Sequence, residues 1–203
     1  RVSKIYCAPG NGGISDIAEC VPIKVMEFQK LIDFAKEKEI DLTVVGPDDP
    51  LVFGISDEFI KAGLKVFGPT KDGAQIEGSK VFSKELMKKY NIPTAKYEVF
   101  ESYDDALCYI TKENSYPTVI KAEGLALGKG VIIATNLDEA KDALKEIMVD
   151  KIFGESGNRV VIEEFLTGPE ISVLSFCDGE TIVPMVSAQD HKRAYDNDKG
   201  PNT

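Results

Sequence analysis

A glycine-rich turn with two nearby lysines is the stretch of this sequence best suited to chemistry. Two β-branched, apolar runs at residues 118–122 and 131–135 predict a pair of strands. Lys121 lies at the end of the first strand and Lys129 in the turn, which contains Gly124, Gly128 and Gly130. Because glycine lets backbone N–H groups approach a ligand closely, the pattern predicts a hairpin folded over a polyphosphate. An ordinary glycine-containing hairpin with an exposed lysine has the same pattern.

Two well-known phosphate motifs do not fit this turn. A P-loop has four residues between its first glycine and the Gly-Lys pair, followed by Ser or Thr and a helix. Here three residues separate Gly124 from the pair, Gly130 follows the lysine, and a strand is predicted next. The Rossmann fingerprint also opens a helix, so it fails for the same reason. The turn alone therefore leaves the choice between phosphate binding and an ordinary hairpin open.

Composition and charge limit the partners of this chain. Its 203 residues are 43% hydrophobic and 29% charged, as in ordinary soluble globular proteins, and the net charge is −10. This charge argues against nucleic acid or a membrane surface as a partner, and no apolar run reaches the ~18 residues of a spanning helix. The four cysteines have no Cys-x-x-Cys spacing and His191 is the one histidine, which argues against a histidine-based zinc site. We expect a cytoplasmic protein with reduced thiols.

The first third of the chain alternates predicted strands and helices with short loops, which indicates α/β architecture and a parallel sheet. The predicted strands are 4–7, 41–45 and 65–67, and the helices are 26–38 and 55–62. Loops 8–13 and 46–50 follow the carboxyl ends of strands, where ligands collect in such sheets, although turn chemistry alone also explains their composition.

The sequence changes character from Lys71 onward. A charged helix at 79–90, with Val81, Phe82 and Leu86 facing inward, is followed by a compact α+β unit over 95–158. That unit contains a strand at 97–100, the hairpin, and helices whose start signals are Ser102 with Asp105 and Asn136 with Glu139. Further strands are predicted at 160–166, 170–176 and 181–185.

We predict two domains from this pattern, over residues 1–73 and 74–203, with 95–158 as a subdomain of the second. The chain begins with Arg1 rather than methionine, and its last residues, 200–203, read as a turn. We therefore expect a segment of a longer protein.

Four charged features occur in a fixed order along the second domain. Lys80 begins a helix, Lys121 precedes the glycine turn, the run Glu163-Glu164-Phe165-Leu166 closes an apolar strand, and Glu170 follows a Gly-Pro turn. Each alone is compatible with an ordinary surface charge, Glu163 for example with an acid on an edge strand. Together they suit a nucleotide: lysines neutralise phosphate, a strand edge pairs with adenine, and a carboxylate accepts from ribose hydroxyls.

This order of motifs resembles that of the ATP-grasp superfamily. Five further runs, at 45–51, 66–70, 77–80, 189–193 and 200–203, are similar to the phosphoribosylamine–glycine ligase family. The resemblance extends over nearly the whole chain. It implies a Rossmann-like N-terminal domain followed by an ATP-grasp domain in which residues 95–158 form a lid.

The resemblance also implies an activity and its cofactors. A ligase of this family uses ATP, with Mg²⁺ or Mn²⁺, to join glycine to 5-phosphoribosylamine through glycyl phosphate, which yields glycinamide ribonucleotide in purine biosynthesis. The family's opening strand, its first phosphate loop and its metal-binding Glu and Asn are expected outside residues 1–203, so we expect this segment alone to be inactive. Another ATP-grasp ligase or carboxylase, or a non-catalytic nucleotide-binding module, remains an alternative.

Residue roles follow from the same resemblance. The phosphate residues are Lys80 and Lys121, and the covering loop holds Gly128, Lys129 and Gly130. Glu163, Glu164, Phe165 and Leu166 are expected at adenine, and Glu170 at ribose. The expected substrate residues are Asp190, His191, Lys192, Pro201, Asn202, Thr203 and, more weakly, Asp48. Gly12 replaces the alanine of the family's first loop, with no clear consequence.

Overall fold

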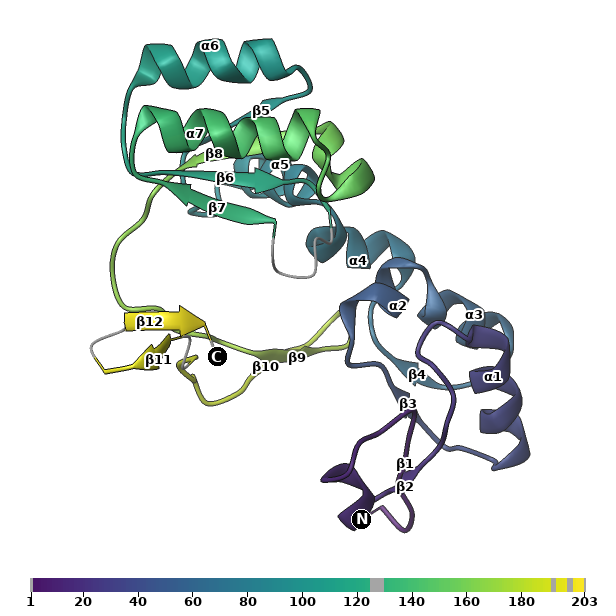
Figure 1. The fold of residues 1–203 in the computed structure, drawn as a ribbon. Coiled ribbons are helices and arrows are strands. Elements are labelled where there is room, and N and C mark those ends of the chain that lie inside the picture. The colour runs from purple at the N-terminus through teal and green to yellow at the C-terminus, as the bar shows by residue number, and fades with distance from the viewer. Residues whose placement is uncertain (1, 125–129, 191–192, 197–198, 203) are drawn as a thin grey trace. The chain divides into compact units, whose positions relative to one another are not determined.

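The computed structural model describes residues 2–124, 130–190, 193–196 and 199–202 (Figure 1). These residues divide into two compact units, Arg1–Phe165 and Leu166–Thr203. Within the described ranges, no helix is long and apolar enough to cross a membrane.

Short parallel strand pairs begin the first unit, which confirms the predicted strand direction. The pairs are β1 (Tyr6–Cys7) with β2 (Glu19–Cys20), and β3 (Thr43–Val44) with β4 (Val66–Phe67). Helices α1 (Phe28–Glu37) and α3 (Ile55–Lys61) form where the apolar spacing predicts them. Their buried faces meet in one cluster that contains Ile32, Ala35, Ile55 and Phe59.

Four short elements of this part are absent from the sequence prediction. They are the strand β2, the 3₁₀ turn η1 (Ile14–Asp16) and the helices α2 (Asp48–Val52) and α4 (Lys71–Gly78). The Gly-Pro-Asp-Asp-Pro run indicates a turn, but Asp48 and Asp49 occupy the first turn of α2, where acidic side chains favour a helix start. Helix α4 runs continuously across the predicted domain boundary at residue 73.

A four-stranded antiparallel sheet forms the second part of the first unit. Its strands are β5 (Tyr97–Phe100), β6 (Thr118–Ala122), β7 (Val131–Ala134) and β8 (Val160–Glu164), in the order β5-β8-β6-β7. The predicted hairpin of β6 and β7 is confirmed, and Thr118 pairs with Ala134. Because β8 lies in the middle, residues beyond the 95–158 span are needed to complete this sheet.

Helices α6 (Tyr103–Glu113) and α7 (Leu137–Leu144) lie against one face of this sheet, and the π-helical turn η2 (Lys145–Val149) continues α7 (Figure 1). Both predicted start signals are confirmed. The Ser102 side chain accepts from the Asp105 N–H at 3.3 Å, and the Asn136 side chain accepts from the Glu139 N–H at 3.0 Å. The 3₁₀ turn η3 (Gly154–Asn158) then leads into β8.

Helix α5 (Lys80–Lys89) is capped at its N-terminus by Ser79, whose side chain accepts from the Phe82 N–H at 3.1 Å. The prediction that Phe82 faces inward is wrong, because this side chain is exposed. Val81 is buried as predicted, and Lys84 is the other buried residue of the helix. A lysine is tolerated there because its ammonium group has hydrogen-bond acceptors and a carboxylate beside it.

The second unit consists of short antiparallel pairs: β9 (Ser175–Cys177) with β10 (Ile182–Pro184), and β11 (Arg193–Tyr195) with β12 (Lys199–Asn202). The predicted Asp178-Gly179 turn joins the first pair, and Asp178 Oδ1 accepts from the Thr181 N–H at 2.7 Å. The prediction of a turn at residues 200–203 is wrong for 200–202, which belong to β12. An edge position tolerates Pro201, which has no N–H to donate to a partner strand.

Candidate functional site

The period of two in β6 and β8 places a lysine and a glutamate on the same face of the sheet. Ile120 and Ile162 are buried in the core beneath α6 and α7. Their chain neighbours Lys121 and Glu163 therefore lie on the opposite face. Lys121 pairs with Val161 across the strands, so Glu163 is its diagonal neighbour, within reach of a long side chain.

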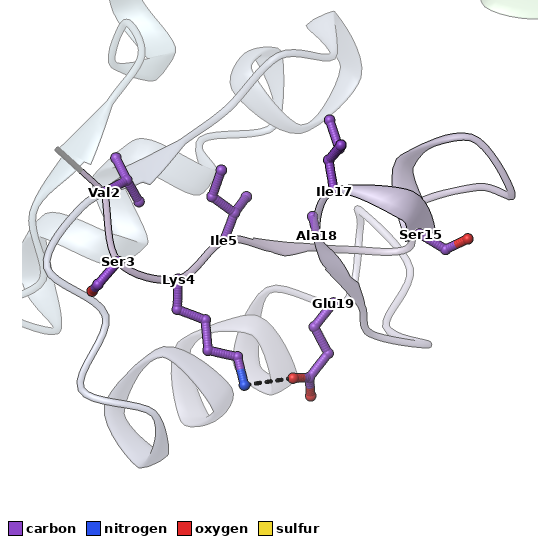
Figure 2. A pocket seen from close by; sticks show the side chains of 8 residues that line it. All are labelled: Val2, Ser3, Lys4, Ile5, Ser15, Ile17, Ala18 and Glu19. Carbon is purple, nitrogen blue, oxygen red and sulfur yellow. Dashed lines mark ion pairs between the residues drawn. The ribbon is translucent and has the colours of Figure 1, made fainter.

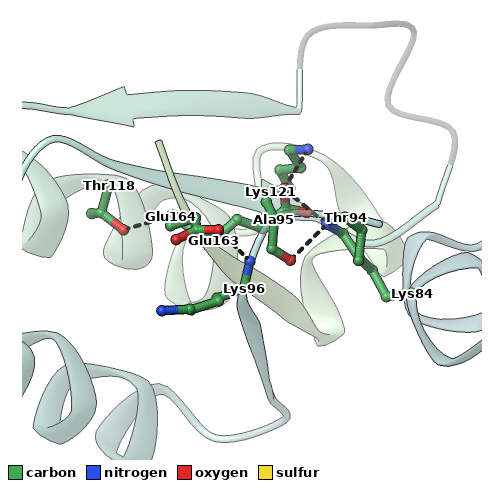
Figure 3. Close-up of polar contacts among 8 residues, drawn as sticks. All are labelled: Lys84, Thr94, Ala95, Lys96, Thr118, Lys121, Glu163 and Glu164. Carbon is green, nitrogen blue, oxygen red and sulfur yellow. Dashed lines mark hydrogen bonds and ion pairs between the residues drawn. The ribbon is translucent and has the colours of Figure 1, made fainter. Parts of the chain in front are cut away.

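Lys121 and Glu163 form an ion pair on that face (Figure 3). The lysine Nζ donates to Glu163 Oε2 at 2.9 Å. Glu163 is only 5% exposed, and β8 is paired on both sides along its length. The interpretation of Glu163 as an acid on an edge strand is therefore wrong, and as a buried carboxylate it depends on nearby counter-ions.

A second lysine, which the sequence analysis missed, approaches the same carboxylate from α5. Lys84 Nζ lies 3.3 Å from Glu163 Oε2 and donates to Thr94 Oγ1 at 2.7 Å and to the Ala95 carbonyl at 3.4 Å. Lys84 follows Lys80 by four residues, a spacing that places both on one side of the helix. That spacing is the signal in the sequence that could have indicated it.

The other oxygen of Glu163 lacks a hydrogen-bond partner among the described residues. Oε1 is buried and has no hydrogen-bond partner in the described part of the chain. A buried acceptor without a donor costs roughly 1–3 kcal/mol, more when it is charged. A ligand that brings an N–H or O–H donor to this position recovers that free energy.

Lys80 holds the beginning of the glycine turn in this structure. Its Nζ donates to the Gly124 carbonyl at 2.6 Å. Burial lowers the pKa of Lys80 below its ordinary value, and the positive charge of Lys121 lowers it further. The proximity of the two charges creates a cationic site suited to an anion such as a phosphate.

Glu123 fixes the same segment from the other side. Its Oε1 accepts from Ser79 Oγ at 2.5 Å, and its Oε2 forms an ion pair with Arg159 Nε. Across the start of the turn, the Gly130 carbonyl accepts from the Ala122 N–H at 2.8 Å. The two ends of the predicted covering loop are thus anchored by hydrogen bonds.

The run predicted to hold adenine leaves the sheet at its third residue. Glu164 is the last residue of β8; its N–H donates to the Lys96 carbonyl at 3.0 Å and its Oε1 accepts from the Lys96 N–H at 2.9 Å. Phe165 and Leu166 follow, with exposed side chains. Because Glu164 is engaged in the sheet, Phe165 and Leu166 are the better placed of the four to present backbone groups to a base.

The remaining predicted site residues are spread over both units. Asp48 is exposed in the first turn of α2, just after β3, and Glu170 and Asp190 are exposed in the second unit. Pro201 and Asn202 belong to β12. Predicted residues outside the described ranges are Gly128, Lys129, His191, Lys192 and Thr203.

A pocket of about 500 Å³ lies elsewhere, around the first strands (Figure 2). It is lined by Val2, Ser3, Lys4, Ile5, Ser15, Ile17, Ala18 and Glu19. Lys4 and Glu19 form an ion pair of 2.7 Å there, and none of the predicted site residues lines it. This pocket is therefore separate from the Lys84, Lys121 and Glu163 cluster.

A metal ion in a protein is held by several His, Cys, Asp or Glu side chains, and the described residues bear on whether this chain has such a site. They contain no group of three or more His, Cys, Asp or Glu side chains that could hold a metal ion. The described residues therefore do not by themselves form a site for the divalent cation that the resemblance implies.

Comparison with known families defines the class of protein. The model described as "Phosphoribosylglycinamide synthetase, ATP-grasp (A) domain" matches residues 78–203, which carry the lysine and glutamate cluster. The model described as "Phosphoribosylglycinamide synthetase, N domain" matches residues 1–77. The chain belongs to the phosphoribosylglycinamide synthetase family, for which binding of ATP with a divalent metal ion is typical.

Individual relatives agree with this assignment. The chain is 53% identical to a phosphoribosylamine–glycine ligase of Caldanaerobacter subterraneus and 54% identical to one of Halalkalibacterium halodurans. Both matches cover the whole chain but only 48% and 47% of the relatives. A crystal structure of the Thermotoga maritima ligase is also similar, with 34% sequence identity and a TM-score of 0.78. The match covers 98% of this chain and 47% of the Thermotoga maritima chain. The chain thus spans about half the length of the relatives it matches.

Proposed function

We propose that this chain is the nucleotide-binding part of an ATP-dependent ligase that joins glycine to 5-phosphoribosylamine. The products are glycinamide ribonucleotide, ADP and phosphate, in de novo purine biosynthesis. The observation that carries the proposal is that the two family models together cover the whole chain. The cytoplasm as location, Mg²⁺ or Mn²⁺ as the metal ion, and the lack of nucleic-acid or membrane partners are parts of the same proposal.

The proposed ATP site is the face of the sheet that carries Lys121 and Glu163. Because the net charge of the chain is −10, a polyphosphate needs local positive charge, which Lys80 and Lys121 supply. The unpartnered Glu163 Oε1 suits the amino group of adenine. From the family resemblance we also assign adenine to Phe165 and Leu166, ribose to Glu170, and the phosphates to the loop with Gly128, Lys129 and Gly130.

The chemistry requires charge neutralisation and positioning more than a base. A carboxylate oxygen of glycine attacks the γ-phosphorus, and the bond to the oxygen that leaves with ADP breaks. The amine of 5-phosphoribosylamine then attacks the carbonyl carbon of glycyl phosphate, phosphate leaves, and the nitrogen loses a proton. Lys80 and Lys121 offset the phosphate charge. We assign the substrate side to Asp48, Asp190, His191, Lys192, Pro201, Asn202 and Thr203.

An assay of ADP formation tests this function in the protein that carries the chain. We expect ADP to form when ATP, glycine and 5-phosphoribosylamine are all present, and glycinamide ribonucleotide to form in equal amount. ADP formation that requires bicarbonate or another carboxylate instead of glycine would show a different ATP-grasp reaction. Tight ATP binding without turnover under any of these conditions would show a binding module.

A further inference from the structure

The charged residues of the cluster, Lys84, Lys121 and Glu163, differ in how many partners their side chains have. Lys84 has three N–H donors and three acceptors around it: Thr94 Oγ1, the Ala95 carbonyl and Glu163 Oε2. Its side chain is 10% exposed. Two hydrogen bonds and an ion pair therefore fix this lysine between α5 and the sheet (Figure 3).

Lys121 is held more loosely than Lys84. Its side chain is 26% exposed, and Glu163 is its single ion-pair partner among the described residues. The positive charge of Lys121 is close enough to Lys80 to lower the pKa of Lys80. Lys121 is thus the member of the cluster that can change partner at the smallest cost.

Glu163 Oε2 has the ammonium groups of both Lys84 and Lys121 beside it. If Lys121 were the sole counter-ion of Glu163, moving it to a phosphate would leave a buried carboxylate without a partner. Breaking a buried pair in that way is strongly destabilising. A second, fixed lysine on the same oxygen removes this cost.

We propose that Lys84 is a positioning residue that keeps Glu163 paired, so that Lys121 can leave Glu163 for a phosphate group of the bound nucleotide. The inference rests on the proposed nucleotide-binding function. It goes further in that it assigns a role to a buried lysine that touches neither substrate nor nucleotide. Lys84 acts on phosphate binding only through Glu163 and Lys121.

Binding measurements on the protein that carries this chain test the proposal. The probes are a non-hydrolysable ATP analogue, titrated by calorimetry, and adenosine, measured by competition with it. In K84M, Lys121 has to stay with Glu163, so we expect the dissociation constant of the analogue to rise about 10-fold or more. Adenosine affinity should change much less, because adenosine has no phosphate.

Matched variants separate this role from a general loss of structure. K88M removes a lysine from an exposed position of the same helix and should leave both affinities unchanged. K84R keeps the positive charge and should recover part of the loss. In the E163Q background no carboxylate needs a counter-ion, so adding K84M should change the affinity for the analogue by less than about 2-fold.

Three results would overturn the proposal. They are an unchanged affinity for the analogue in K84M, an equal loss for the analogue and adenosine, and an undiminished effect of K84M in the E163Q background. If K84M alone does not fold, the comparison of E163Q with the K84M/E163Q double variant decides. Failure of the unmodified protein to bind the analogue at all would instead contradict the proposed function.

Discussion

Lys121 is the residue on which nucleotide binding depends most in this account. Its ammonium group is the most exposed charge of the cluster and lies at the end of β6, directly before the glycine turn. An alternative explanation is that it only completes an ion pair at the end of a strand. The two explanations differ in what they expect of ATP affinity.

We predict that K121M weakens binding of a non-hydrolysable ATP analogue by about 1.5–3 kcal/mol, the range for hydrogen bonds to charged groups. The reason is that a phosphate loses its cationic partner. Calorimetric titration measures the change, and K96M serves as a matched control, because Lys96 is an exposed lysine of the same sheet region. Equal affinities in K121M and K96M would mean that Lys121 is only a strand-end charge.

The lowered pKa of Lys80 has a measurable effect on stability. The unfolded chain binds this proton up to the ordinary lysine pKa of 10.5, whereas the folded chain releases it at lower pH. Between the two pKa values, Lys80 is more often protonated in the unfolded state than in the folded state. The free-energy cost of burying the charged form therefore lowers the stability at neutral pH and is lost as pH rises. We predict that the free energy of unfolding of the unmodified protein, minus that of K80M, increases from pH 7 to pH 10.

Urea unfolding of both proteins at several pH values measures this difference, and the titration of groups that do not interact with Lys80 cancels in it. A difference that stays constant or decreases with pH would show that the ammonium group of Lys80 is well solvated. The comparison uses ligand-free protein, because a bound phosphate would favour the charged form.

How well single residues could be predicted depended on their sequence context. Lys80, Lys121 and Glu163 stand beside a helix start, a glycine turn and a strand end, where a charge is conspicuous. Lys84 lies inside a helix with many charges, and its sequence looks like a solvated face. Its four-residue spacing from Lys80 places it on the same side of the helix. Its burial, however, depends on Thr94, Ala95 and Glu163, which come from other segments, so the spacing does not indicate that it is buried.

At the scale of elements, the best predictions were those with a local physical cause. The capped helices α6 and α7 and the β6–β7 hairpin carry their start, stop and period in the sequence. The central place of β8 in the sheet could not be predicted, because strand order depends on contacts between distant segments. Helices α2 and α4 were missed because their Pro- and Gly-containing sequences indicate turns.

The contact between η3 and η2 gives a prediction at this scale. An added Cβ on Gly157 would lie 2.1 Å from the Ile147 carbonyl oxygen, which belongs to the backbone and cannot rotate away. We expect G157A to lower the free energy of unfolding by about 1–3 kcal/mol, as overpacking does.

G12A is the matched control for that variant, because no atom lies within 4 Å of the corresponding position on Gly12. Its effect should stay within about ±0.5 kcal/mol. Urea unfolding of both variants measures the two effects. Similar stabilities of G157A and G12A would show that η3 can move away from η2 without cost.

At the scale of the whole molecule, the family could be predicted because its motifs are distributed along the entire chain. The models for the N domain and the ATP-grasp domain meet between residues 77 and 78, at the last residue of α4. The predicted domain boundary at residue 73 and the lid over 95–158 stay predictions. The motifs did not predict how charge is arranged in the fold. Although the net charge of the chain is −10, Lys80, Lys84 and Lys121 lie beside one face of the sheet.

The measurement that tests the central claim most directly is a crystal structure of the protein that carries this chain with a non-hydrolysable ATP analogue bound. We predict that the phosphates lie within hydrogen-bond distance of Lys80 Nζ and Lys121 Nζ, with the adenine amino group at Glu163 Oε1. Lys121 should have left Glu163, and Lys84 should remain on it. An analogue bound at another surface, with the 2.9 Å contact between Lys121 and Glu163 intact, would contradict the account.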